Sequence, residues 1–261
     1  MAIMRLDHAD APDTGDHTSL PSHRQIAAEI ELTGAAQLPA VVPEQWLDEV
    51  RQYTRDLDPD VHEVMLEGAD ASALPFLRDL ISSPELLALL DSVAQLTCPA
   101  RDTAGSGIDI ECALRVINGV DPSNRPLWFH YDASVLTMVL PIDIPDAGNG
   151  RSGELILCPN RRPYRRRALT NVLEKALTQN DTYRRRFLRR LNWDRDTEVI
   201  PLKPGNAYLF WGYRSYHATM PIAPGARRVT VVVHYRDVHA QSRIVKYAKA
   251  FRHETSRFGV R

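Results

Sequence analysis

The sequence has little of what defines several protein classes. Its 261 residues include only three cysteines, Cys98, Cys112 and Cys158, and no Cys-x-x-Cys pair. This excludes a disulfide-stapled miniprotein and favours buried thiols in a reducing compartment. No apolar run approaches the ~18 residues of a membrane span, so we expect no membrane association. Residues 1–20 lack the basic-then-apolar order of a signal peptide, which predicts a cytoplasmic protein.

Acidic and basic residues are unevenly distributed although the formal net charge is only −1. Residues 1–100 hold 5 Lys/Arg against 18 Asp/Glu, whereas residues 201–261 hold 11 against 2. Such a basic region can bind nucleic acid, or it can pair with the acidic region within one fold. Because the basic residues are not interleaved with stacking aromatics, a nucleic-acid partner is the less favoured interpretation.

Hydrophobic periodicity predicts a helical part followed by strands. Residues 1–22 are polar and aperiodic, so we expect a mobile arm. Helical spacing of apolar residues predicts a helix over 43–57 and one or two over 74–97, where Ser83 can cap the second. Alternation begins at residue 107, and a basic helical stretch over 165–191 interrupts the strands. The predicted strands cover residues 107–116, 127–131, 135–142, 154–158, 198–202, 207–211, 217–221 and 227–235.

This order predicts a mainly β fold with flanking helices, a barrel or sandwich supported by an N-terminal helical buttress. We expect residues 23–261 to form a single domain. Its parts would be a helical prologue over 23–100, a β core over about 107–236 and a C-terminal helical extension over 237–261.

The pair His130 and Asp132 is the first candidate for chemistry. Side chains two residues apart on an extended segment point to the same side, so an imidazole and a carboxylate can meet at one point. His217 is the obvious third ligand. Two imidazoles and one carboxylate on one face leave coordination positions open on an octahedral iron, which oxygen activation requires.

Four pieces of sequence occur in an order that is familiar from one enzyme superfamily. His130-x-Asp132 is followed by Ser152-Gly153-Glu154-Leu155, by Pro204-Gly205-Asn206 four residues before Phe210, and by His217 with a basic residue 10 or 11 positions later. The chain resembles the Fe(II)/2-oxoglutarate-dependent oxygenases of the double-stranded β-helix (jelly-roll, cupin-like) fold, in their phytanoyl-CoA-hydroxylase-like or prolyl-hydroxylase-like branches. Ser152 and Asn206 depart from the family's usual Gly and Asp.

The resemblance implies that His130, Asp132 and His217 bind Fe(II), with 2-oxoglutarate and O2 as cosubstrates. An unactivated C–H bond of a small molecule would be hydroxylated while 2-oxoglutarate is converted to succinate and CO2. That substrate could be anionic or tethered to a carrier protein. Halogenating relatives typically have Gly or Ala in place of Asp132, so hydroxylation is favoured over halogenation. Desaturation and cyclisation remain open.

The resemblance also implies a basic residue that holds 2-oxoglutarate, and strand alternation bears on which one. On the last strand the valine-rich face is suited to pack against helices, so Arg228 and Thr230 are expected to point inward. A guanidinium can bind a carboxylate through two parallel hydrogen bonds. Arg227 is the alternative if a bulge shifts the register.

Two other functions and several further residues remain open at this stage. The fold also suits a metal-dependent isomerase or epimerase without O2 chemistry, or a non-catalytic binding protein. His234 could line the pocket or sit in the core, and Thr137 could reach the cosubstrate or simply pack. Four side chains are candidates for substrate contact, with core or surface packing as the alternative: Trp128, Arg161, Trp211 and Arg214.

Overall fold

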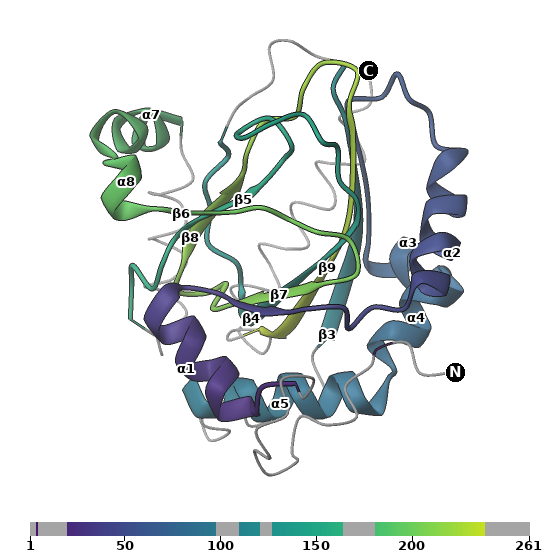
Figure 1. Ribbon diagram of the computed structural model, residues 1–261, viewed down its shortest axis with the longest axis horizontal. Helices are drawn as coiled ribbons and strands as arrows, with labels where there is room; N and C mark the ends of the chain where they lie inside the picture. The colour runs from purple at the N-terminus through teal and green to yellow at the C-terminus, as the bar shows by residue number, and fades with distance from the viewer. Residues whose placement is uncertain (1–3, 5–19, 98–109, 121–126, 164–180, 238–261) are drawn as a thin grey trace.

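The computed structural model describes residue 4 and residues 20–97, 110–120, 127–163 and 181–237. Its centre is formed by two antiparallel sheets (Figure 1). The larger sheet has the strand order β1 (Ala36–Leu38), β7 (Ala207–Phe210), β4 (Ser134–Asp143), β9 (Arg227–Asp237), β3 (Ile110–Asn118) and β2 (Glu63–Glu67). The smaller has the order β6 (Glu198–Ile200), β5 (Leu155–Cys158) and β8 (Tyr216–Thr219).

Helices cover the outer sides of the sheets. Along the six-stranded sheet lie α1 (His23–Thr33), α2 (Glu44–Arg55), α3 (Gly68–Ala73), α4 (Pro75–Ile81) and α5 (Pro84–Thr97). Beyond the three-stranded sheet stand α7 (Asp181–Arg190) and α8 (Trp193–Asp196), at the upper left of Figure 1. Within the described part of the chain, no helix combines the length and apolar character needed to cross a membrane.

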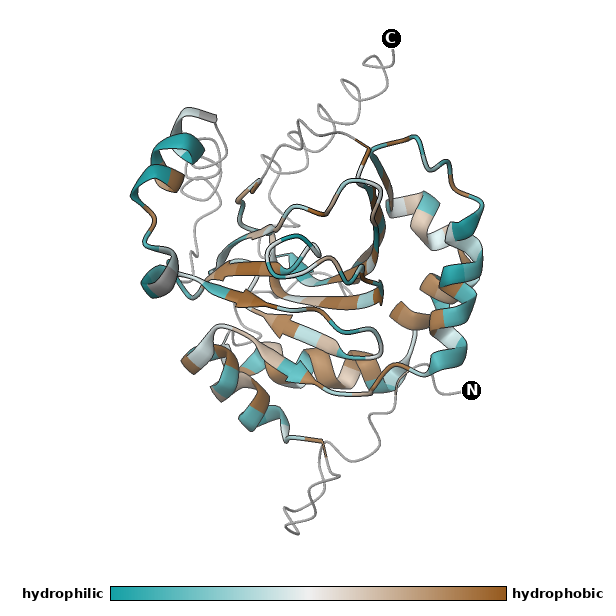
Figure 2. Ribbon diagram, turned by 45° about the horizontal axis from the view of Figure 1, so that its top comes forward, coloured by the Kyte–Doolittle hydropathy of each residue, from teal (hydrophilic) through white to brown (hydrophobic). Residues whose placement is uncertain are grey.

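Alternation along the strands divides the apolar side chains among three clusters. Val229, Val231 and Val233 of β9 pack with the helices on the outer side of the six-stranded sheet. Between the sheets, Val139 and Phe210 pack against Leu157. A third cluster joins Phe129 and Tyr216 to Phe187 of α7. The strands are accordingly brown at the centre of Figure 2 and the outer faces of the helices largely teal.

Most of the predicted elements are present. The helix over 43–57 is α2, and the stretch over 74–97 is divided into α4 and α5, with Leu86 N–H donating to the Ser83 hydroxyl at 3.3 Å. The valine-rich face of β9 packs on helices as predicted. The signals that predicted these elements, apolar spacing and a capping serine, are local, which is why they could be identified from short windows.

Some predictions need correction. Residues 127–131 form a single bridge at His130 instead of a strand, and β1 and β2 lie within the predicted helical prologue. Both are short edge strands. They pair with β7 and β3, which are distant in sequence, and are too short for hydrophobic alternation within them to predict a strand. Most of the predicted arm over 1–22, the predicted extension from 238 and residues 164–180 of the basic stretch lie outside the described residues.

Candidate active site

Two segments far apart in sequence bring three potential metal ligands together. The His130 N–H donates to the His217 carbonyl at 2.9 Å, and the His217 N–H donates back to the His130 carbonyl at 3.0 Å. This bridge places the imidazole centroids 4.3 Å apart. The Oδ1 atom of Asp132 lies 3.5 Å from Nε2 of each histidine. One donor atom from each of the three side chains lies within 4.8 Å of the others.

Backbone carbonyls set the orientation of both imidazoles. Nδ1 of His130 lies 3.0 Å from the Trp128 carbonyl oxygen, and Nδ1 of His217 lies 3.0 Å from the Ser215 carbonyl oxygen. Since a carbonyl oxygen only accepts, each Nδ1 carries the proton and donates it. The Nε2 lone pairs then remain for a metal ion on the side of Asp132.

The charge state of this cluster suits a cation. Burial alone would raise the pKa of Asp132, but His217 and then His234 hold this pKa well below its usual value of 3.8. Burial and His217 lower the pKa of His130. Burial opposes a charge on His217 as well, yet Asp132 raises the pKa of this imidazole above 6.5. A metal ion that binds here competes with a proton for Nε2 of His217.

A second set of groups fixes the Asp132 carboxylate. The Thr137 hydroxyl donates to Oδ2 of Asp132 at 2.5 Å. The Ser134 hydroxyl lies 3.1 Å from the Thr137 hydroxyl and 3.0 Å from Nδ1 of His234. A methyl group on Gly212 would stand 2.1 Å from the Thr137 hydroxyl and 2.5 Å from Oδ2 of Asp132. The absence of a side chain at Gly212 therefore leaves the space that this hydrogen bond occupies.

Arg228 and Thr230 project from β9 into the space between the sheets. The Arg228 guanidinium is 3% exposed, and its Nε donates to the Gly153 carbonyl at 2.8 Å while Nη1 donates to the Thr230 hydroxyl at 3.0 Å. Burial, followed by the charge of Arg115, lowers the pKa of Arg228 to about 9. Among the described residues no carboxylate forms an ion pair with Arg228. A buried cation in this situation is stabilised by an anionic ligand.

Arg227, the alternative to Arg228, lies on the opposite face of β9. It donates to the Thr54 carbonyl at the end of α2. The pairing of β9 with β3 runs without a shift, with Ile117 opposite Arg228, and the irregularity near Pro141 affects only the pairing with β4. No bulge therefore turns Arg227 inward.

Comparisons with known proteins agree with this architecture. No protein-family model matches the sequence, and no curated protein matches it significantly. Solved structures match well. The α-ketoglutarate-dependent epimerase SnoN from nogalamycin biosynthesis aligns with a TM-score of 0.55 and 14% identity over 82% of this chain and 83% of its own. The chain has the fold of the Fe(II)/2-oxoglutarate-dependent oxygenases.

Two other oxygenase-fold structures span different reactions. A prolyl 4-hydroxylase structure from Phytophthora capsici has a TM-score of 0.53 and 15% identity, and covers 84% of this chain and 64% of its own. HygX from Streptomyces hygroscopicus, with nickel and 2-oxoglutarate bound, has a TM-score of 0.52 and 12% identity, over 81% of this chain and 86% of its own. At these identities the oxygenase fold is shared, and the reaction must be argued from the site.

Trp128 and Arg161, two of the four predicted substrate contacts, pack against α7. The ring of Trp128 is 49% exposed, and the Arg184 guanidinium lies 3.5 Å from its centroid. The Arg161 guanidinium lies 5.0 Å from the centroid of Phe187. Because Trp128 also provides the carbonyl that orients His130, α7 is packed directly on the segment that carries a candidate metal ligand.

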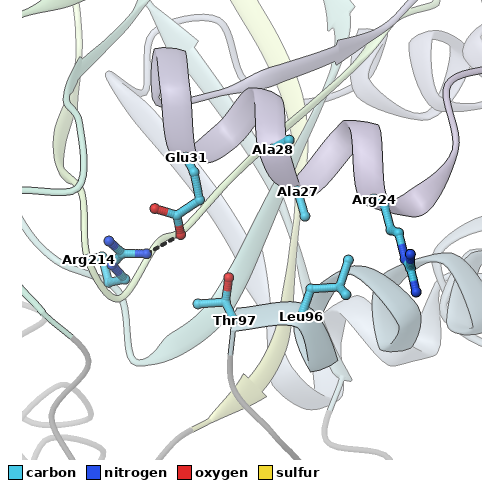
Figure 3. Close-up of a pocket in the computed structure, with 7 residues that line it drawn as sticks. All are labelled: Arg24, Ala27, Ala28, Glu31, Leu96, Thr97 and Arg214. Carbon is cyan, nitrogen blue, oxygen red and sulfur yellow. Dashed lines mark hydrogen bonds and ion pairs between the residues drawn. The ribbon is translucent and has the colours of Figure 1, made fainter.

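The other two predicted substrate contacts, Trp211 and Arg214, interact with the helical side of the protein. Trp211 is fully buried in the cluster on the helical side of the six-stranded sheet. Arg214 turns toward α1, where it pairs with Glu31 beside a pocket between α1 and α5 that also includes Leu96 and Thr97 (Figure 3). The structure thus groups Arg214 with these helices and not with the three potential metal ligands.

Sequence reasoning missed or set aside several residues of this oxygenase-fold site. The sequence leaves Thr137 as a cosubstrate contact or a packing residue, whereas in the structure its hydroxyl donates to the Asp132 carboxylate. Arg115 of β3 went unnoticed, although it is a charged residue on the same strand face as Ala113 and Ile117, both buried. Gly212 carries no local signal, because its role depends on a contact with Asp132 80 positions earlier in the sequence.

Proposed function

We propose that this chain is an iron(II)- and 2-oxoglutarate-dependent dioxygenase that hydroxylates an unactivated C–H bond of a small, anionic molecule. The observation that carries the proposal is the convergence of His130, Asp132 and His217 on one point, with Arg228 buried in the same space between the sheets. Residues 23–237 would act as one domain, since α1 to α5 share a hydrophobic cluster with the six-stranded sheet.

The strand order supports a double-stranded β-helix for the core. The chain passes from β3 in the larger sheet to the His130 bridge on β8, returns to β4, then enters β5 and β6 of the smaller sheet. It returns to β7, crosses to β8 and ends in β9. Repeated crossing between two sheets is typical of this architecture, and both sheets carry candidate ligands.

The donor set fits iron. Two atoms that each lie ~2.1 Å from one ion are at most ~4.2 Å apart. The 3.5 Å separations from Asp132 to His130 and His217 satisfy this limit, and all three donor atoms lie within 4.8 Å of one another, so a small movement of the imidazoles would complete the site. Two imidazoles and one carboxylate on one side form the set that leaves positions open at a non-haem Fe(II). When bound, the metal with 2-oxoglutarate and O2 would supply the oxidising chemistry.

The chain's own residues would perform three tasks around that metal. His130 and His217 would donate Nε2, with Nδ1 fixed by carbonyl groups. Asp132 would donate Oδ1 while Thr137 holds Oδ2. Arg228 and Thr230 would bind the distal carboxylate of 2-oxoglutarate, because a guanidinium with a free edge matches a carboxylate.

The presence of Asp132 favours hydroxylation over halogenation, because its carboxylate would occupy the coordination position that a halide ion needs. Proteins of similar structure include an epimerase, a carbocyclase and a prolyl 4-hydroxylase, so the product must be determined directly. A hydroxylated product gains one oxygen atom. An epimerised product keeps the mass of the substrate, and a cyclised or desaturated product loses two hydrogens.

The direct test is anaerobic addition of Fe(II) and then 2-oxoglutarate to the purified protein. A chelated keto acid at ferrous iron is expected to give a weak visible charge-transfer band near ~500 nm. Admission of O2 with candidate substrates should then release succinate in proportion to product. If the band is absent and 2-oxoglutarate is not bound, the proposal is wrong.

A further inference from the structure

A second arginine faces the space between the sheets. Arg115 of β3 lies opposite Thr230 of β9 in the register, next to the hydroxyl that accepts from Arg228. Its Nη1 reaches across to the smaller sheet and donates to the Thr219 hydroxyl at 3.2 Å. Thr219 follows the candidate metal ligand His217 by two residues on β8. Arg115 therefore contacts the strand that carries His217 and lies opposite Thr230, the hydrogen-bond partner of Arg228.

The donor groups of Arg115 are only partly used. Nε donates to the Glu63 carboxylate at 2.5 Å and Nη1 donates to Thr219. In the part of the chain that the structure describes, no acceptor contacts Nη2. Arginine carries five N–H donors in a planar fork, so an edge of this guanidinium remains for a further acceptor. Glu63 and Thr219 hold the fork in place and leave that edge open.

Arg115 is more exposed to solvent than Arg228. The Arg228 residue is 3% exposed, whereas the side chains of Arg115 and Glu63 are 28% and 37% exposed. Met65, directly opposite Arg115 on β2, is 49% exposed. Cross-strand neighbours share one face of a sheet, so an accessible cation lies beside an accessible apolar side chain. The region is suited to an organic acid with an apolar body.

The charge of Arg115 also acts on its surroundings. After burial, it is the largest cause that lowers the pKa of Arg228. Glu63 supplies one nearby negative charge, but it is partly solvated. Two like charges that face one space favour an anion there, because the anion is attracted by both.

We propose that Arg115 binds a carboxylate of the primary substrate at the exposed edge of the space between the sheets, with Glu63 orienting the guanidinium and Met65 contacting the apolar part of the same molecule. The inference rests on the proposed function and adds the substrate class: a small organic acid with an apolar portion next to its carboxylate. Arg228 is left for the cosubstrate.

The test compares hexanoate with its neutral analogue hexanamide as probes, on protein saturated with Ni(II) and 2-oxoglutarate. Ligand-observed NMR measures the two dissociation constants for the wild type, Arg115→Gln, Arg115→Lys and Glu63→Gln. Arg186→Gln on the exposed face of α7 is the matched control. Affinity for 2-oxoglutarate is measured separately for each variant through the charge-transfer band with Fe(II).

We expect the wild type and the control to prefer hexanoate, and Arg115→Gln to lose about tenfold or more of hexanoate affinity without loss of hexanamide affinity. Arg115→Lys should retain part of the preference. Glu63→Gln should bind hexanoate more tightly, because it removes a competing negative charge and keeps an acceptor for Nε. A purely structural ion pair would not give this opposite change in the two partners.

Three results would overturn the proposal: equal affinity of the wild type for both probes, unchanged hexanoate binding in Arg115→Gln, or a loss of 2-oxoglutarate binding in that variant. If Arg115→Gln does not fold, Arg115→Lys and Glu63→Gln provide the same comparison. If the protein binds neither Ni(II) nor 2-oxoglutarate, the proposed function fails. The hexanoate preference can still be measured then, on metal-free protein with Arg228→Gln in the background.

Discussion

The two ends of the space between the sheets have opposite chemistry. At one end, lone pairs from His130, His217 and Asp132 face one another and need a cation. At the other end, the guanidinium groups of Arg228 and Arg115 present N–H donors and need an anion. The metal-ligand end is therefore suited to a cation, and the buried guanidinium of Arg228 is suited to the distal carboxylate of a keto acid.

The two ends are also held differently. Both imidazoles and the carboxylate are fixed by hydrogen bonds to carbonyl oxygens and to the Thr137 hydroxyl. Arg228 is fixed by one carbonyl and one hydroxyl and has no carboxylate partner among the described residues. Such an arrangement lowers the reorganisation needed on binding at both ends, at some cost to the stability of the ligand-free fold.

The largest effect should come from removing the charge at the cation end. Asp132→Ala is expected to weaken Ni(II) binding by at least ~100-fold, since it deletes a direct ligand and leaves two imidazoles near Arg115. Isothermal titration calorimetry measures this loss. Asp143→Ala, at the exposed end of β4, is the control and should bind Ni(II) normally. Equal binding by both variants would place the metal elsewhere.

Removing the charge at the anion end should be comparable but selective. Arg228→Gln is expected to weaken 2-oxoglutarate binding by ~100-fold or more, because two charge-assisted hydrogen bonds of ~1.5–3 kcal/mol each are lost. Ni(II) binding should persist. The control Arg227→Gln alters the adjacent residue, whose side chain contacts α2, and should leave 2-oxoglutarate affinity unchanged.

The same substitution has a second, opposite consequence. Burial lowers the pKa of Arg228 to about 9, so the charged side chain destabilises the ligand-free fold. Arg228→Gln should therefore keep or raise the melting temperature of the ligand-free protein while it loses 2-oxoglutarate. A drop in melting temperature would contradict this expectation, and would indicate that the hydrogen bonds of Arg228 to Gly153 and Thr230 stabilise the ligand-free fold by more than its burial destabilises it.

Substitution of Thr137, which only orients the Asp132 carboxylate, should weaken metal binding less than substitution of Asp132 itself. Thr137→Val keeps the shape of the side chain but removes the hydroxyl, and should weaken Ni(II) binding by about 10- to 100-fold. Thr137→Ser restores the hydroxyl and should recover most of the affinity. Recovery by serine distinguishes the hydrogen bond to Asp132 from packing, because serine lacks the methyl group that a packing role would need.

Sequence reasoning performed unequally at the two ends. His130, Asp132 and His217 could be predicted because spacing of two residues and a recognisable order of motifs identify them. The choice of Arg228 over Arg227 as the inward residue followed from the valine-rich opposite face of one strand. The contact of Arg115 with Thr219 could not be predicted, because it joins strands of two different sheets. Thr137 lies only five residues after Asp132, but no periodicity shows that the chain turns its hydroxyl toward this carboxylate.

The helices and the edge strands also differ in how well the sequence predicts them. A helix such as α2 is encoded by its own apolar spacing, whereas β1 and β2 exist because β7 and β3 provide partners. Gly153 is an intermediate case. It was identified as part of a motif, but the physical reason for glycine is visible only in the structure. Its φ is +73°, and a methyl group there would lie 2.3 Å from Cδ of Arg228.

A methyl group at Gly153 should have the smallest of the expected effects on 2-oxoglutarate binding, and Gly150 provides a control for it. Gly153→Ala should displace the Arg228 side chain from the Gly153 carbonyl and weaken 2-oxoglutarate binding by about tenfold, the equivalent of one hydrogen bond. Gly150→Ala introduces the same strain at φ +76°, yet its methyl group would only touch the end of Met220 at 3.5 Å. Both variants should lose stability because both force a side chain into a left-handed backbone conformation, and Gly153→Ala should lose more because its methyl group also lies 2.9 Å from Cγ2 of Ile222. Only Gly153→Ala should lose 2-oxoglutarate affinity, and equal losses in the two variants would mean that backbone strain, and not the contact with Arg228, explains the glycine.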